Sequence, residues 1–268
     1  MPRGVRENDW SVVQTRGAEI VESYETGVTL RQLYYRLLSE GLANTKTFYT
    51  DLAARSAMWR RAGTFPELVD GTRGIERYAS WTSPAAALID LRAQYRRDRT
   101  EGQKWSIYLG TEARGLVKQL SSWFGDPLGI PILALGGQSS RPFQVDALED
   151  IDRQDRPSVL LYAGDLDSSG EKIEEVFTRH VAFDRVERVA LTDAQMNAFN
   201  LTKLPGMAKD VNAKAFIARH GSLYRVEVDA LEPTVFRSLF QEAIDRYWNA
   251  DAYAIAMSAE SADREELS

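Results

Sequence analysis

The spacing of apolar residues divides the chain into a helical first part and a second part of alternating strands and helices. In residues 10–28, 29–41 and 44–63, apolar side chains recur every three or four positions, which predicts three amphipathic helices. Thr29 is a favourable N-cap for the second helix, and Gly41 is a favourable stop. Short connections between such helices suggest a helix-turn-helix with a wing at residues 63–78, although a three-helix unit without a DNA-binding role fits the pattern equally well.

From residue 104 onward, short apolar runs alternate with amphipathic segments. The predicted strands are residues 105–110, 131–136, 158–162 and 186–191, and the predicted helices are residues 113–124, 145–151 and 171–177. Repeated strand–helix units predict a mostly parallel sheet flanked by helices, with right-handed crossovers. We therefore expect an α/β domain over residues 101–250, preceded by a mainly helical domain over residues 1–100.

The C-terminal part is less regular. Residues 224–231 alternate between apolar and polar side chains as a strand does, and residues 233–249 have the spacing of an amphipathic helix. The last residues, 251–268, are rich in acidic side chains and are expected to form a frayed tail.

Composition excludes several kinds of chemistry. The chain of 268 residues has no cysteine, so disulfides, thiolate metal sites and a cysteine nucleophile are absent. The first eight residues lack the apolar core of a signal peptide and no run is long enough to span a bilayer, so a cytoplasmic protein without a membrane partner is expected. Residues 31–99 carry twelve Lys or Arg against seven Asp or Glu, although the net charge of the chain is −6. A basic N-terminal module joined to an acidic, metal-binding module would explain this asymmetry, and so would ordinary surface charge.

Three carboxylates are predicted to meet at one edge of the sheet. Asp165 and Asp167 follow the third strand, and Glu112 ends the first. The carboxyl ends of parallel strands share one edge, where open α/β sheets bind their ligands. Closely spaced carboxylates repel unless a cation joins them, and a site made only of oxygen suits Mg²⁺ best, with Mn²⁺ also possible. For the Asp-x-Asp pair alone, the alternative is that Asp165 caps the next helix and Asp167 is a solvated turn residue.

Two further acids lie on the predicted strand at residues 224–231. Glu227 and Asp229 alternate with apolar residues and can reach the edge of the same site, or they can have surface or capping roles. The two histidines, His180 and His220, show no ligand spacing.

Several short motifs resemble those of one protein family. Glu112 followed by Asp-Leu-Asp-Ser-Ser-Gly at residues 165–170 resembles the Toprim domain of topoisomerases, bacterial primases and certain nucleases. Gly-Gln-Ser-Ser-Arg at residues 137–141 and Leu-Arg-Gln-Leu-Tyr-Tyr at residues 30–35 are similar to segments of the topoisomerase VI A subunit and the related meiotic double-strand-break protein. The resemblance covers residues 25–250 and is greatest to the short, stand-alone A-subunit-like proteins of phages and mobile elements. Ser168-Ser169 departs from the family pattern, in which a Pro-containing segment is common.

This resemblance implies an α/β Toprim domain preceded by a winged-helix (CAP-like) domain, and it implies a nucleophile. In the family the second tyrosine of the pair, here Tyr35, attacks DNA and forms a 5′-phosphotyrosyl bond, while Tyr34 is the alternative. A phenol is a weak nucleophile at neutral pH, so Arg31, one helical turn before Tyr35, is expected to lower the phenol's pKa and to pair with phosphate. By the same resemblance, Glu112, Asp165 and Asp167 would hold Mg²⁺.

The resemblance also implies partners. Double-stranded DNA would be the substrate, and its phosphates are expected to contact Lys46, Arg55, Arg60 and Arg61. In the family the tyrosine of one subunit meets the acids of the other, which implies a homodimer. The chain has no ATP-binding module, so ATP-driven strand passage would need a separate B-type ATPase subunit. A phage-encoded protein would act in the cytoplasm of its host cell.

Two other functions are compatible with the sequence. A Toprim nuclease would use water activated by the metal, and its tyrosines would be structural. A DNA-binding accessory protein would keep the fold without the catalytic activity.

Overall fold

The N-terminal module is a bundle of three helices around a shared apolar core. The computed structural model describes residues 9–42, 44, 45, 47–70, 77–137, 139–207 and 209–267, without the side chain of Arg114. The helices are α1 (Trp10–Glu22), α2 (Leu30–Ser39) and α3 (Phe48–Arg61), all shorter than their apolar patterns. Thr29 and Gln32 form a capping box that begins α2, as Thr29 predicted. Of the predicted wing, residues 71–76 lie outside the described part, and the described remainder contains no strand.

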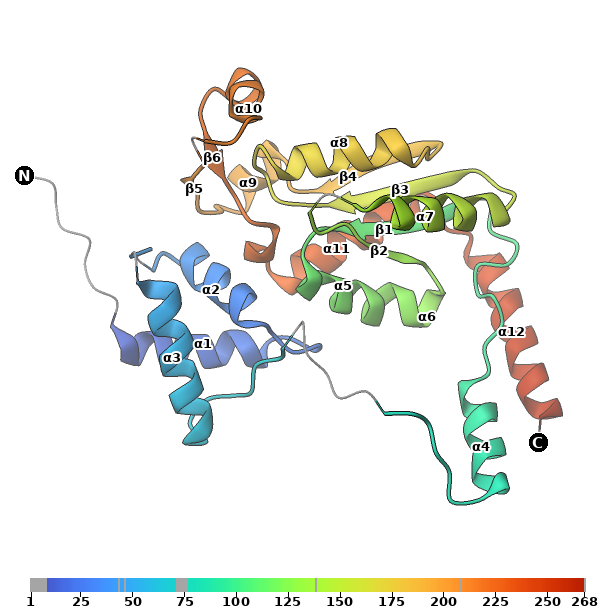
Figure 1. Cartoon of the computed structure of the whole chain (residues 1–268). Coiled ribbons are helices and arrows are strands. Elements are labelled where there is room, and N and C mark those ends of the chain that lie inside the picture. Colours follow the sequence, from blue (N-terminus) through green and yellow to red (C-terminus); the bar gives the residue numbers. More distant parts are fainter. Residues whose placement is uncertain are drawn as a thin grey trace, which may run out of the picture.

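The second module is mixed α/β and is built on a four-stranded parallel sheet (Figure 1). Its strands lie in the order β2 (Ile132–Ala134), β1 (Ser106–Thr111), β3 (Ser158–Ala163) and β4 (Arg185–Ala190). Every residue of β1 and β3 is buried, because both faces of these apolar strands are covered by helices. Thr111 pairs with Ala134 and Ala163, so three strands end at the same level. The predicted parallel sheet is thus confirmed.

Helices cover both faces of this sheet. One face packs against α5 (Arg114–Leu120), a π-helical turn (Ser121–Gly125) and α11 (Pro233–Asp245), and the other packs against α7 (Arg141–Arg153) and α8 (Gly170–His180). The predicted helix at residues 113–124 therefore changes to π geometry at Ser121 and continues into the short α6 (Asp126–Leu128).

The predicted strand at residues 224–231 is mostly wrong. Only β6 (Tyr224–Arg225) is a strand, paired with β5 (Leu204–Pro205), and Val228–Ala230 forms a 3₁₀ turn, η2. Val226 exchanges backbone hydrogen bonds with Leu166, after which the N–H of Val228 donates to Asp165 Oδ1 at 2.8 Å. The strand pairing therefore ends here, because the next backbone N–H donates to a side-chain carboxylate instead of to a neighbouring strand. The remaining elements of this region are α9 (Asp193–Ala198) and α10 (Ala213–His220).

The expected frayed tail is instead a helix, α12 (Ala250–Glu266). Asn249 caps its first turn, and the buried Glu260 accepts two hydrogen bonds from Arg99. These contacts stabilise a segment whose acidic composition suggested disorder. Helix α4 (Pro84–Gln94) connects the two modules and lies near the C-terminal end of α12 (Figure 1). No helix in the described part is long and apolar enough to cross a membrane.

Candidate active-site cleft

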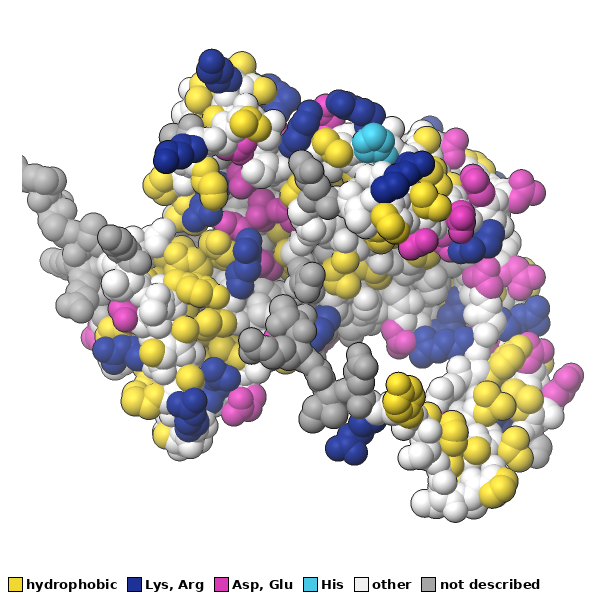
Figure 2. All heavy atoms as spheres, viewed as in Figure 1, with side chains coloured by type: hydrophobic (Ala, Val, Ile, Leu, Met, Phe, Trp, Pro, Cys, Tyr) yellow, Lys and Arg dark blue, Asp and Glu magenta, His cyan; other side chains and the backbone are white. Residues whose placement is uncertain are grey.

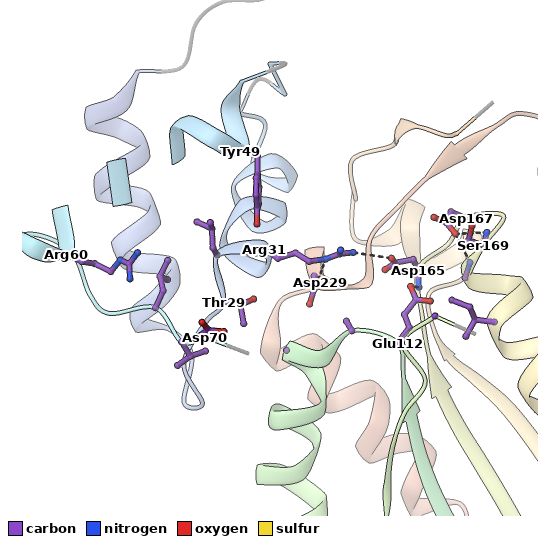
Figure 3. Close-up of a pocket in the computed structure, with 18 residues that line it drawn as sticks. Thr29, Arg31, Tyr49, Arg60, Asp70, Glu112, Asp165, Asp167, Ser169 and Asp229 are labelled. Atoms are coloured by element: carbon purple, nitrogen blue, oxygen red, sulfur yellow. Dashed lines mark hydrogen bonds and ion pairs between the residues drawn. The ribbon is translucent and has the colours of Figure 1, made fainter. Parts of the chain in front are cut away.

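A cleft of about 850 Å³ separates the carboxyl edge of the sheet from the N-terminal helices (Figure 3). The sheet side contributes acids, and the helical side contributes Arg31, Arg60 and Tyr49. The acids on the sheet side are Glu112, Asp165, Asp167 and Asp229, and one further acid, Asp70, lines the cleft from the N-terminal side. The three acids predicted to meet at this edge of the sheet thus line one cleft.

Glu112 and Asp165 form the innermost part of the acidic wall. Glu112 Oε1 accepts a hydrogen bond from the backbone N–H of Asp165 at 2.9 Å, while Glu112 Oε2 is buried and has no hydrogen-bond partner in the described structure. Burial, and then the nearby Glu112 carboxylate, raise the pKa of Asp165 well above its usual value. Two carboxylates held this close favour either a proton or a cation between them.

Asp167 has a different role from Asp165. Its Oδ1 accepts hydrogen bonds from the backbone N–H groups of Ser169 and Gly170, at 2.9 and 2.7 Å, and so caps the start of α8. Of the pair, Asp167 rather than Asp165 therefore caps the helix. Within the described residues, no group of three or more acids and histidines is close enough to form a complete metal cage.

The donor set at this edge nevertheless fits Mg²⁺. Glu112 Oε2 is buried and has no hydrogen-bond partner in the described structure, so nothing offsets the cost of removing this oxygen from water. Glu112 and Asp165 offer only oxygen, and Mg²⁺ commonly binds one or two carboxylates while keeping several waters. These two residues would hold the ion, with Asp167 at the rim of the site.

Arg31 reaches from α2 into the acidic wall of the same chain. Its guanidinium lies 2.7 Å from Glu227 Oε2. It also lies 3.5 Å from Asp229 Oδ2 and 3.7 Å from Asp165 Oδ2 (Figure 3). Burial lowers the pKa of Arg31, but the surrounding carboxylates, Glu227 first, outweigh this effect and raise it overall. Arg31 is therefore a fixed cation that joins the two modules.

Glu227 and Asp229 belong to this site, whereas the sequence left surface and capping roles open for them. Both side chains are only 4% exposed. Burial and the neighbouring Asp165 raise the pKa of Glu227 to about 7. Burial raises the pKa of Asp229 to about 6, and Arg31 opposes that shift. The signal for these two acids was their alternation with the buried Val226 and Val228.

Tyr35 lies behind Arg31 and does not line the cleft. Its side chain is 8% exposed, and the guanidinium carbon of Arg31 lies 5.3 Å from the centre of its ring. Burial, and then Glu227, raise the pKa of Tyr35, and this outweighs the lowering effect of Arg31. The Tyr34 hydroxyl donates to Asn44 Oδ1 at 2.9 Å, and Tyr49, 45% exposed, is a tyrosine that does line the cleft.

The predicted DNA-contacting residues do not form one group. Arg60 lines the cleft, although Glu67 lies 3.6 Å from its guanidinium. Arg55 stacks on the ring of Trp10 at 4.5 Å, and Arg61 is exposed at the end of α3. Lys46 lies outside the described residues.

The fold and the cleft thus define a mixed α/β protein with a cleft that carboxylates line on the sheet side and that Arg31, Arg60, Tyr49 and Asp70 line on the other side. A scan against protein-family models and a search of curated proteins found no match for the chain. The geometry of the cleft and the sequence resemblance are therefore the basis for assigning a function.

Proposed function

We propose that the protein is a Mg²⁺-dependent enzyme that cleaves double-stranded DNA, similar to the topoisomerase VI A subunit. In this proposal residues 101–250 are a Toprim domain and the N-terminal helices are a variant of the winged-helix domain. The observation that carries the proposal is the pairing of Glu112 and Asp165 on one wall of the cleft with Arg31 and Arg60 on the other.

The two walls match the charges of a phosphodiester. Arginine pairs well with phosphate oxygens because its guanidinium donates two parallel hydrogen bonds. Mg²⁺, or Mn²⁺, on Glu112 and Asp165 would supply positive charge to the phosphorane oxygens and to the leaving 3′ oxygen. Arg31 and Arg60 would position the backbone, and Tyr49 offers an aromatic surface beside it.

Tyr35 is the first candidate for the nucleophile. Its oxygen would form a bond to phosphorus while the bond from phosphorus to the 3′ oxygen breaks; the phenolic proton leaves and the 3′ oxygen gains one, giving a 5′-phosphotyrosyl end and a free 3′ hydroxyl. Tyr35 is next to Arg31, which supports this role. Its burial requires that α2 shift before DNA can reach it, and exchange of the N-terminal module between two chains of a homodimer is one such shift. Strand passage would still need a separate B-type ATPase.

Water is the second candidate for the nucleophile. The burial of Tyr35 and its absence from the wall of the cleft favour a nuclease in which metal-activated water attacks directly. That reaction would leave a free 5′ phosphate, and the tyrosines would only pack the helical core.

A denaturing gel of end-labelled duplex DNA incubated with the protein and Mg²⁺ or Mn²⁺ separates these possibilities. The tyrosine reaction predicts a covalent adduct in the wild type and in Tyr49→Phe, and its loss in Tyr35→Phe. Cleavage without adduct that persists in Tyr35→Phe would establish the water reaction. Glu112→Gln should abolish cleavage in both cases, so cleavage that survives this substitution would refute the whole assignment.

A further inference from the structure

Helix α4 is an apolar helix that buries nothing in its own chain. None of its eleven residues is buried, and Leu88, Ile89 and Leu91 are 67, 71 and 60% exposed. Tyr78 and Trp81 lie just before it and are also exposed. Five of the fifteen large hydrophobic residues exposed in the described structure therefore fall within residues 78–91, which we term the α4 arm. Figure 2 shows these hydrophobic side chains gathered at the lower right, over α4.

In the described part of the chain, the α4 arm is tethered to the body at its C-terminal end. Arg92 Nε donates to the backbone carbonyl of Arg264, and the Tyr95 hydroxyl donates to Asp263, both near the end of α12. A helix of eleven residues is marginally stable in water unless its apolar surface is packed. Because the large apolar residues of α4 are not packed within the described part of the chain, the stability of this helix has to come from a surface outside it.

We propose that the α4 arm pairs with the α4 arm of a second copy of this chain, as two antiparallel helices related by a two-fold axis close to Leu88. Such an interface is self-complementary, so each exposed side chain is buried twice per dimer. Ala85, Ala86 and Ala87 at the start of the helix are small enough to let the two helices approach closely. The proposal concerns assembly and stands whether or not the protein cleaves DNA.

The charges of the α4 arm favour a second copy over other partners. Its one charged residue is Asp90, which accepts hydrogen bonds from Trp81 and Gln94. Arg92, which directly follows the arm, donates to the backbone carbonyl of Arg264. The arm thus carries no cation that would bind nucleic acid, and its single charge gives little repulsion between two copies, although the chain carries −6 overall. Trp81 and Tyr78 supply the aromatic side chains that are enriched in the energetic centres of interfaces.

The chain contains a matched pair of residues for the test. Ile89 in the α4 arm and Ile255 on α12 are both helical, and both are 71% exposed. In sedimentation velocity over a concentration series, the wild type and Ile255→Glu should form a reversible dimer. Ile89→Glu should raise the dissociation constant by at least about 100-fold, because one buried isoleucine is lost from each copy. Circular dichroism and the melting temperature should show that both variants are folded.

Cross-linking gives a second, geometric test because the chain has no cysteine. Leu88→Cys should form a disulfide-linked dimer under mild oxidation, whereas Ile255→Cys should stay monomeric on a non-reducing gel. A wild type that is monomeric at every concentration, or an Ile89→Glu variant that dimerises as the wild type does, would overturn the proposal. A monomer that binds neutral phosphatidylcholine vesicles, with loss of binding in Ile89→Glu, would also overturn it and assign the α4 arm to a lipid surface.

Discussion

Replacing Arg31 with methionine should destabilise the protein in a way that depends on pH. The side chains of Glu227 and Asp229 are nearly inaccessible to water, and Arg31 is the cation between them. Removing one partner of a buried ion pair typically costs about 3–5 kcal/mol, because a buried charge is left uncompensated. Arg31 itself is 55% exposed, and Arg225 remains 3.5 Å from Glu227. Solvent and Arg225 thus reduce the effect, and we expect a loss of about 2 kcal/mol near pH 8.

The sign of the pH dependence follows from Asp229. Its pKa in the folded protein is raised to about 6, above its ordinary value of 3.8, so the native state binds this proton more tightly than the unfolded state does. Stability from this group therefore increases as the pH falls through the folded pKa. Arg31 lowers that pKa, and its removal will raise it further. In the Arg31→Met variant a proton can then replace the guanidinium, and the loss should shrink to less than about 1 kcal/mol near pH 5.

Urea unfolding of the metal-free protein, followed by tryptophan fluorescence across this pH range, measures the effect. Arg31→Lys keeps the charge and should lose much less stability. In an Asp229→Asn background, Arg31→Met should cost less and should vary less with pH, because one of the two buried acids that it leaves unpaired is gone. A loss from Arg31→Met that is the same near pH 5 as near pH 8 would show that Arg31 contributes packing rather than charge.

Three further predictions concern the helix cap, the C-terminal helix and the cleft. Asp167→Ala should lower the free energy of unfolding by about 1 kcal/mol while Asp167→Asn, which keeps the cap, should cost little in chemical denaturation. Glu260→Gln should cost about 3 kcal/mol, because it leaves the buried side of Arg99 unpaired; a variant as stable as the wild type would show that α12 is held by other contacts. Ca²⁺, a hard cation that resembles Mg²⁺, should raise the affinity for a fluorescent DNA duplex about tenfold in anisotropy measurements. Glu112→Gln should remove that increase, and an equal increase in this variant would place the cation elsewhere.

The sheet was predictable from the sequence because its strands are buried on both faces. Continuous apolar runs such as Val159–Tyr162 indicate a covered parallel strand, and the turn residues after them locate the carboxyl edge. The strand at residues 224–231 was mispredicted because apolar and polar residues do alternate there, as in a strand, whereas the backbone beyond residue 226 does not form the hydrogen bonds of a sheet. Instead, the N–H of Val228 donates a hydrogen bond to Asp165, which is far away in the sequence. No local pattern carries that contact.

The candidate site was predictable in part for the same reason. Residues at strand ends, such as Glu112 and Asp165, share an edge because of the topology alone. Which acid of the Asp-x-Asp pair caps α8 depends on the backbone conformation of the turn, and the sequence does not specify it. The ion pair between Arg31 and Glu227 joins two modules of the same chain, and no local pattern indicates such a contact. The resemblance instead indicated that the N-terminal module of a second subunit would meet the acids.

If the proposed function is correct, the position of Arg31 would link DNA binding to metal binding. A phosphate that pairs with Arg31 competes with Glu227 and Asp229 for the same guanidinium, and both acids are too buried to be compensated by water. DNA alone would therefore leave uncompensated negative charge in the wall of the cleft and add more. A divalent cation held by Glu112 and Asp165 would restore the balance, because it would supply two positive charges at the edge that Arg31 had left. Each ligand should then strengthen the other, and the coupling must be reciprocal. Arg31 pairs with the acidic edge in this structure, and in the proposed function it would become a phosphate ligand once a cation neutralised that edge.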